Sequence, residues 1–205
     1  MIEFYTANSS NGQRVAVMLE ECGLPYTLHK VDLMGGEQHR PEFLRINPAA
    51  AIPAIVDQDG PGGRPLTLAQ SGAIMVYLAE KTGRFLPADP VRRAHAFQWL
   101  MQSLSDVSAT GSVLFLLGNF APEKSDANQR WFGERFVKFL RDADRCLATR
   151  EYLADELSIA DFSLYPVANS RRALVDAAGD LPHLVRWMAA LGGRPGVARG
   201  VAAAA

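Results

Sequence analysis

Cysteine is scarce in this chain of 205 residues, which contains only Cys22 and Cys146. The two residues stand far apart and form no CxxC pair, so the sequence offers neither a disulfide scaffold nor a cysteine-based metal motif. The 4 histidines lack ligand spacing relative to acidic residues or cysteines, and we therefore expect no metal. Because unpaired cysteines are typical of reducing compartments, we expect a cytoplasmic protein.

An excess of charge of one sign is also absent. The chain has 21 basic and 22 acidic residues and a formal net charge of −1, which indicates no nucleic acid and no membrane as partner. No uninterrupted apolar run approaches about 18 residues, the length that spans a membrane. No basic segment followed by an apolar one opens the sequence, because Ile2–Tyr5 already has the pattern of a strand. We expect an ordinary globular protein of one or two domains.

Strand and helix signals alternate over roughly the first 80 residues. Turn residues at Asp59–Gly63 predict a hairpin between the last two strands of this region. The order β-α-β-α-β-β-α is typical of a mixed sheet whose first crossover is parallel. The predicted strands cover residues 2–5, 27–31, 54–56 and 66–68, and the predicted helices cover residues 12–22, 41–46 and 70–81.

The second part of the chain contains only helical patterns. Gly83–Pro90 has the composition of a linker. We therefore expect an α/β domain over residues 1–82 and an all-α domain over residues 91–205, joined by residues 83–90. Ser158 and Asp161 have the spacing of a capping box, in which each side chain satisfies the other's backbone amide. The predicted helices cover 91–117, 127–147, a segment starting at 158, and 181–191, and an alanine-rich tail follows Pro195.

A proline interrupts the strand pattern of Ala51–Asp57. Proline cannot donate to a sheet, so Pro53 belongs at a strand's first position or on an edge. The Ile52–Pro53 bond is a good candidate for the cis form, which costs about 0.5–1 kcal/mol relative to trans. A cis bond would turn the Ile52 amide and carbonyl outward, towards an extended peptide-like ligand. Gln70–Ser71 then opens a helix whose free amides attract a carboxylate. Together these segments predict a site for a small anionic peptide.

Three motifs, in this order and spacing, resemble those of the cytosolic glutathione transferases: Ile52–Asp57, Gln70–Ile74 and the Ser158–Asp161 box. The resemblance covers essentially the whole chain. Within the family the sequence is most similar to the bacterial nu-class group, on the segments Asn11–Gly12, Gln38, Arg40–Leu44 and Ala79–Gly83.

The resemblance implies a thioredoxin-like N-terminal domain with a mixed four-stranded sheet, followed by an all-α C-terminal domain. It also implies a homodimer that uses glutathione as co-substrate, without a metal. The second partner would be a small hydrophobic electrophile or a disulfide. Its pocket, in this family, includes the first helices of the second domain, where Leu104, Ser108, Phe115 and Phe120 are candidate walls.

The loop Asn8–Gly12 supplies donors at the start of a helix, which suits a thiolate. A free thiol has a pKa near about 8.5, and lowering it by about two units requires roughly 2.7 kcal/mol. A helix N-terminus contributes about 0.3–2 kcal/mol, and a hydrogen bond to the charged sulfur contributes roughly 1.5–3 kcal/mol. The nu-class pattern points to Asn11 and Ser9 as donors, and Ser10 is the next candidate. Tyr5 lies too early relative to the loop.

The remaining site residues follow from the family motif. Gln70 and Ser71 are expected to hold the γ-glutamyl carboxylate and amine, and Ile52, followed by Pro53, is expected to pair with the cysteinyl backbone. Gln38 is expected to approach the glycyl carboxylate, with Arg40 as a second candidate.

The predicted activity is that of a glutathione transferase whose thiolate attacks an electrophile, a disulfide or a peroxide. Disulfide-bond reduction stands close beside conjugation, because nu-class relatives favour it. A maleylacetoacetate-isomerase-like enzyme is an alternative, since Ser9–Ser10 and Arg14–Val15 resemble that class's opening motif, although Asn11 and Gln13 replace its cysteine and tryptophan. A glutathione-binding regulatory protein without turnover is a third reading.

Overall fold

The computed structural model describes residues 1–205 and divides them into two compact units. The first unit comprises Met1–Arg84 and Gly193–Ala205, and the second comprises Phe85–Gly192. The expected boundaries placed residues 193–205 with the helical domain, whereas in the structure this segment returns to the first unit. The reason is a helix that packs closely on the first helix of the chain, as described below.

A mixed four-stranded sheet organises the first unit. Its spatial order is β2-β1-β3-β4, with β1 parallel to β2 and antiparallel to β3, and with β3 antiparallel to β4. The predicted parallel crossover and the predicted hairpin are therefore confirmed. The strands are β1 (Ile2–Thr6), β2 (Tyr26–Lys30), β3 (Ala54–Asp57) and β4 (Leu66–Ala69).

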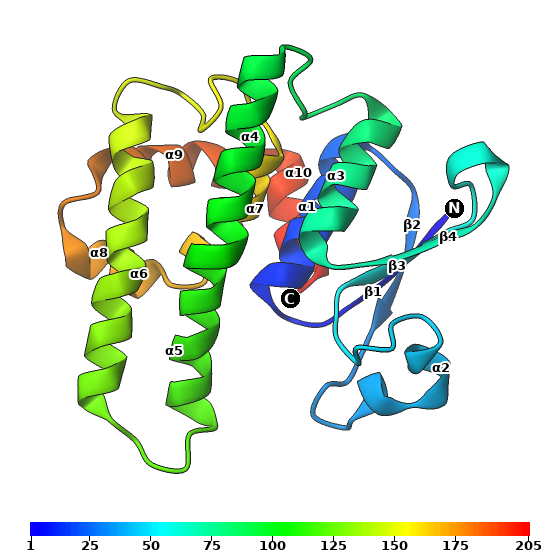
Figure 1. The fold of residues 1–205 in the computed structure, drawn as a ribbon, viewed down its shortest axis with the longest axis horizontal. Helices are drawn as coiled ribbons and strands as arrows, with labels where there is room; N and C mark the ends of the chain where they lie inside the picture. Colours follow the sequence, from blue (N-terminus) through cyan, green and yellow to red (C-terminus); the bar gives the residue numbers. More distant parts are fainter. The chain divides into compact units, whose positions relative to one another are not determined.

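Helices α1 (Ser10–Cys22) and α3 (Ser71–Thr82) pack against each other on one face of this sheet (Figure 1). In β1 the buried residues alternate with half-buried ones, so Phe4 faces the helices and Tyr5 faces the other way. On that second face Tyr5 stacks on His29 and contacts Phe43 of α2 (Pro41–Leu44). Two short 3₁₀ turns, η1 (Glu37–His39) and η2 (Pro61–Gly63), complete the unit's connections.

The helix α10 (Pro195–Ala203) is the element that ties the chain's last residues to the first unit. A Cβ atom on Gly200 would lie 2.5 Å from the Val17 backbone, so the absence of a side chain lets α10 approach α1 closely. Arg194 and Arg199 pair with Glu21 and Glu20 of α1. The sequence predicted only an alanine-rich tail here.

The second unit is entirely helical except for an isolated bridge between Ala154 and Glu156. Helix α7 lies at its core, with nearly every side chain buried. The predicted capping box is confirmed at its start. The Ser158 hydroxyl accepts from a backbone amide of the first turn, and the Asp161 carboxylate accepts from the Ser158 amide. The helices are α4 (Pro90–Gln102), the π-helical segment η3 (Ser103–Ser108), α5 (Ala109–Asn119), α6 (Asp126–Leu147), α7 (Ile159–Asn169), α8 (Arg172–Ala178) and α9 (Pro182–Gly192).

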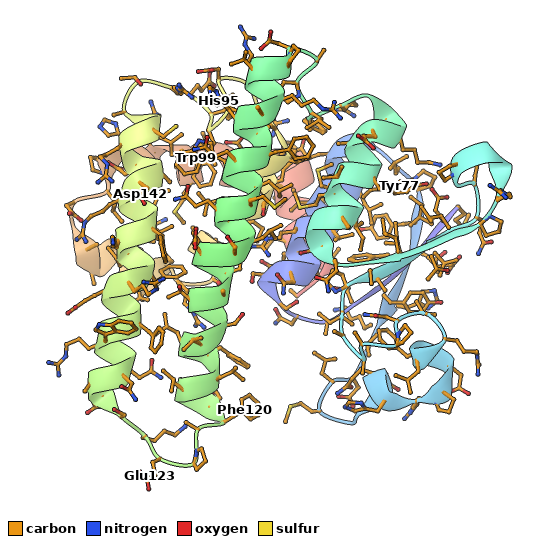
Figure 2. All side chains as sticks on the ribbon, viewed as in Figure 1. Tyr77, His95, Trp99, Phe120, Glu123 and Asp142 are labelled. Atoms are coloured by element: carbon orange, nitrogen blue, oxygen red, sulfur yellow. The ribbon has the colours of Figure 1, made fainter.

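The segments α4, η3 and α5 form one continuous helix, Pro90–Asn119, that runs beside α6 (Figure 1). By length and composition alone this helix is long and apolar enough to cross a membrane, a test that core helices of globular proteins also pass. The prediction of no such segment rested on uninterrupted apolar runs, whereas this helix carries Asp106 among apolar residues. Trp99 lies on its first part, and Phe120 and Glu123 lie at its far end and in the turn leading to α6 (Figure 2).

Candidate functional site

Four chain segments with predicted site residues leave the sheet at the same end. The strand register pairs Thr6 with Lys30 and Tyr5 with Ala54, and it pairs Ala54 with Ala69. Four segments therefore leave the sheet at the same end of its strands: the loops after β1 and β2, the segment before β3 and the segment after β4. This topology places the loop Asn8–Gly12, the Ile52–Pro53 bond and the Gln70–Ser71 pair at the same end of the sheet. The connection that carries Gln38 and Arg40 starts from this end as well.

The first of these segments ends in the N-terminus of α1. Ser9 is the N-cap, and its Oγ accepts from the Gly12 amide at 3.0 Å. The same hydroxyl donates to the Ala7 carbonyl at 3.3 Å, so both of its hydrogen-bonding functions are engaged. The first two amides of a helix, here those of Ser10 and Asn11, have no intrahelical acceptor. No acidic side chain lies in the first turn, so these amides are available to an anion.

Gly12 allows this turn to lie close to β1. A Cβ atom at this position would be 2.1 Å from the Thr6 hydroxyl and 2.8 Å from the Ala7 carbonyl oxygen. The backbone oxygen cannot move away as a flexible side chain would. The helix start is thus fixed against the end of the strand from which its loop emerges.

Asn11 is half-buried, and its Oδ1 accepts a hydrogen bond from Nη1 of Arg14. The Arg14 side chain is fully buried in α1, and burial lowers the pKa of its guanidinium to about 10, so the group stays charged at neutral pH. Sequence reasoning named Asn11 but gave Arg14 no role in the site. The spacing i, i+3 was visible in the sequence, but the burial of an arginine was not.

The segment before β3 contains a cis Ile52–Pro53 peptide bond, as predicted. No hydrogen bond from within the protein engages the Ile52 amide or carbonyl. The preceding turn is held by Asn47, a buried residue whose Nδ2 donates to the Ala51 carbonyl at 2.6 Å and whose Oδ1 accepts from the Ala49 amide at 3.2 Å. The Asn47–Pro48 dipeptide is a turn signal that could have identified this support from sequence.

The segment after β4 leads into α3 at Ser71, one residue later than predicted. Gln70 is the N-cap residue, with φ +71°, and its side chain makes no capping hydrogen bond. A non-glycine residue at positive φ is strained, and such strain clusters at ligand-binding sites. Ser71 is 6% exposed, and its hydroxyl makes no hydrogen bond within the protein. The amides and hydroxyl at the start of α3 are thus left without a cap.

Gln38 and Arg40 lie in and after η1, in the connection between β2 and α2. Nε2 of Gln38 donates to the Leu33 carbonyl at 3.2 Å, and its Oε1 is buried without a partner. A carboxylate needs donors, and this arrangement leaves Gln38 one further N–H of Nε2 to offer. Arg40 pairs with Glu37 at 2.9 Å and its side chain is largely exposed. The arrangement therefore favours Arg40 over Gln38 as a carboxylate ligand.

The candidate second-substrate residues belong to the other unit. Leu104 and Ser108 lie in η3, and the Ser108 hydroxyl donates to the Ser103 carbonyl at 2.6 Å. Phe115 of α5 and Phe120 are 49% and 58% exposed and contact each other edge to face. The two aromatic residues thus form an accessible apolar surface, and Leu104 is half-buried.

Comparisons with known proteins identify the family of the chain. A family model described as the glutathione S-transferase N-terminal domain matches residues 8–81. The chain is 37% identical over 198 residues to the disulfide-bond oxidoreductase YfcG of Escherichia coli, covering 95% of this chain and 92% of that protein. It is 31% identical over 213 residues to the disulfide-bond oxidoreductase YghU of the same organism, covering 97% of this chain and 73% of that protein.

Solved structures match over nearly the whole chain. A glutathione transferase from Burkholderia graminis, with two glutathione molecules bound per subunit, gives a TM-score of 0.91 at 35% identity, covering 98% of this chain and 87% of that one. A glutathione transferase from Pseudomonas putida, with one glutathione disulfide bound per subunit, gives 0.90 at 33% identity, covering 98% and 90%. The chain belongs to the glutathione S-transferase family, and its likeness to the nu-class type is confirmed. The thioredoxin-like fold of the N-terminal domain, with a mostly helical remainder, is confirmed as well.

Proposed function

We propose that this protein binds glutathione at the common end of the sheet, activates its thiol, and works as a glutathione transferase with disulfide-bond reductase activity. The supporting observation is the open N-terminus of α1, where the backbone amides of Ser10 and Asn11 have no intrahelical acceptor. It leaves the sheet at the same end as the Ile52–Pro53 segment, whose Ile52 amide and carbonyl have no hydrogen bond within the protein. The names of the relatives YfcG and YghU and the glutathione bound in similar structures support the same conclusion.

The proposed reaction is thiol–disulfide exchange. The glutathione thiolate attacks one sulfur of a disulfide, forming a mixed disulfide and releasing the other sulfur as a thiolate that takes up a proton. A second glutathione attacks the mixed disulfide, releases the remaining thiol and leaves glutathione disulfide. The same thiolate attacks an electrophilic carbon in conjugation. No general base is needed, because the donors of α1 only have to stabilise the ionised sulfur.

We assign the donors as follows. Asn11 donates to the sulfur through Nδ2, and the amides of Ser10 and Asn11 add the positive end of α1. Ser9 is first a helix cap, since its hydroxyl is engaged by Gly12 and Ala7. This assignment places Asn11 before Ser9 and Ser10 as the residue that lowers the pKa of the thiol.

The rest of the tripeptide follows the four segments. Ile52, followed by Pro53, pairs with the cysteinyl backbone, and the uncapped start of α3 at Gln70 and Ser71 holds the γ-glutamyl end. Arg40 binds the glycyl carboxylate, for which Gln38 is the second candidate. For the second substrate we propose Leu104, Ser108 and Phe115.

The test compares two activities of the purified chain with glutathione: reduction of hydroxyethyl disulfide and conjugation of chlorodinitrobenzene. We expect disulfide reduction to be the faster, and we expect Asn11→Ala to lower kcat/KM about tenfold or more, the loss of one hydrogen bond to a charged sulfur. Unchanged turnover in this variant would remove Asn11 from the mechanism.

Other outcomes separate the alternatives. Glutathione binding by calorimetry without turnover of either compound would indicate a regulatory binding protein, and isomerisation of maleylacetone would indicate the isomerase. Absence of glutathione binding at millimolar concentration would contradict the proposal as a whole.

We also propose that the protein is a cytoplasmic homodimer, as is usual in its family. Sedimentation equilibrium measures the assembly directly, and a monomer at micromolar concentration would contradict the proposed homodimer.

Cys22 and Cys146 are both free thiols, and burial raises the pKa of each above its ordinary value. Neither thiol is therefore primed as a nucleophile.

A further inference from the structure

A fully buried arginine lies one helical turn behind the proposed thiol donor. Residues at i and i+3 are neighbours on one helix face, and Nη1 of Arg14 donates to Oδ1 of Asn11. Its side chain has no solvent exposure, although arginine is among the residues least often buried. Burying a cation is unfavourable unless polar groups receive it. The Asn11 amide is one such group, and it belongs to the proposed site.

The chemistry of the guanidinium fixes which way the amide faces. A guanidinium has five N–H donors and no acceptor, whereas an asparagine amide has an accepting oxygen on one side and a donating NH₂ group on the other. The side of Asn11 that faces Arg14 must therefore be the oxygen. The NH₂ group is left on the side away from Arg14, available to a ligand that accepts hydrogen bonds.

We propose that Arg14 is a positioning residue that holds the Asn11 amide with its oxygen inward and its NH₂ group directed at the glutathione sulfur; this role rests on the proposed function. The hydrogen bond from a cation also polarises the amide and strengthens its N–H donors, because linked hydrogen bonds reinforce each other. Arg14 itself touches neither the sulfur nor the second substrate. It acts on the acidity of the thiol through Asn11.

A comparison with Ser9 shows why the orientation of the Asn11 amide has to be held. A hydroxyl rotates freely, and that of Ser9 already accepts from Gly12 and donates to Ala7. An amide with no fixed partner would turn its oxygen towards a thiol proton as readily as its NH₂ group towards a thiolate. With Arg14 behind it, Asn11 favours only the ionised sulfur.

The test is a double-mutant cycle with Asn11→Ala and Arg14→Met, read as the pKa of the bound thiol by ultraviolet absorbance of the thiolate and by the pH profile of kcat/KM. We expect Arg14→Met to raise the thiol pKa and to lower kcat/KM about three- to tenfold at neutral pH, with KM for glutathione little changed. In the Asn11→Ala background the same change should have no further effect. Additive effects in the cycle would show that Arg14 acts independently of Asn11, and would overturn the proposal.

Two polar substitutions sharpen this result. Arg14→Lys keeps a side chain with donors only, whereas Arg14→Gln can face either end of the Asn11 amide. We expect the lysine variant to retain more of the thiol acidity than the glutamine variant. Equal acidity in the two variants would contradict orientation as the mechanism.

A second measurement stands if substitution of the buried arginine prevents folding. Asn11→Asp keeps an oxygen towards Arg14 but has no NH₂ group for the sulfur. We expect this variant to fold with an unchanged or higher thermal midpoint, and to bind a thiol whose pKa is at or above that of free glutathione, because the carboxylate also repels the ionised sulfur. A clear loss of stability, or an acidic thiol, would contradict the proposed geometry.

The outcomes separate this inference from the function on which it rests. If the wild-type protein binds glutathione without lowering its thiol pKa, the proposed thiol activation is wrong. If the wild type acidifies the thiol and Asn11→Ala abolishes the effect while Arg14→Met leaves it intact, only the role of Arg14 is wrong.

Discussion

Helices α1 and α7 both have serine as N-cap, but they differ in how many of their first-turn amides are capped from within the chain. At α7 the Ser158 hydroxyl accepts from the Ala160 amide, and the carboxylate of Asp161 accepts from the amides of Leu153 and Ser158, the Ser158 hydroxyl and the indole of Trp187. At α1 the Ser9 hydroxyl satisfies one amide, and no acidic residue follows in the first turn. One helix start is closed and buried, and the other is left open.

This difference teaches what a helix N-terminus can be used for. Capping groups from within the chain turn its free amides into folding stability. Where those groups are missing, the same amides and dipole are available to an external anion. The closed end of α7 should therefore govern stability, and the open ends of α1 and α3 should govern glutathione chemistry.

The largest effect should come from opening the closed end. Asp161→Ala leaves the Leu153 and Ser158 amides and the Trp187 indole without their acceptor, and we expect a loss of about 3–5 kcal/mol in the free energy of unfolding. Urea denaturation at pH 7 measures it. The matched control is Asp142→Ala, which removes only a surface ion pair with Arg145 and should change stability by less than about 1 kcal/mol. Similar losses in both variants would contradict the contrast.

The second effect is the pH dependence of the free energy of unfolding that Asp161, at the start of α7, imposes. Burial raises the pKa of Asp161 from 3.8 to about 6, against the four hydrogen bonds that lower it. A raised carboxyl pKa means that the folded state holds the proton more tightly than the unfolded state. Stability from this group is therefore present below pH 3.8 and lost as pH rises to about 6, on the order of 3 kcal/mol.

Asp161→Asn removes this titration and serves as the reference. Between pH 4 and pH 7 the stability of the wild type relative to the variant should fall, as measured by urea denaturation at each pH. A rise over the same range would mean that the four hydrogen bonds outweigh burial and hold the carboxylate ionised.

A third effect concerns the uncapped start of α3. Ser71→Ala removes a hydroxyl that has no partner within the protein, so stability should change by less than about 1 kcal/mol, while glutathione affinity should fall about tenfold. Calorimetry measures the affinity. In the control Ser170→Ala the lost hydroxyl donates to the Val167 carbonyl, and affinity should not change. Parental affinity in the Ser71 variant would exclude this residue from the site.

Much of the candidate site's backbone geometry, and the capping box of the second unit, could be predicted from the sequence because they are local signals. Pro53 marks a strand start, and Gln70–Ser71 marks a helix start; the capping box at Ser158 has a fixed spacing. These patterns depend on local backbone geometry, so they can be recognised without knowledge of the tertiary packing. The parallel first crossover and the hairpin followed from the same local elements, because connection lengths and turn residues limit how strands pair. The spatial order of the four strands came from the structure.

The features that the sequence did not reveal depend on tertiary packing. The segment Pro195–Ala203 contains two glycines and reads as a tail, yet it forms α10, since Gly200 lets it approach Val17 of α1. The burial of Arg14 was equally hidden, because arginine on a helix is normally exposed. The π-helical turn η3 has no sequence signature of its own.

The smallest effect should come from partly closing the open end. Ser10→Asp places a carboxylate in the first turn of α1, as Asp161 does in α7, and we expect it to stabilise the helix by about 0.3–1 kcal/mol. A charge there also opposes ionisation of the nearby sulfur, so the thiol pKa should rise by less than about one unit. The change appears as a few-fold loss of kcat/KM below the thiol pKa that fades at alkaline pH and in high salt. Ser10→Asn has nearly the same shape without the charge and should show neither effect; if it matches the aspartate variant, the electrostatic distinction between the two helix starts is wrong.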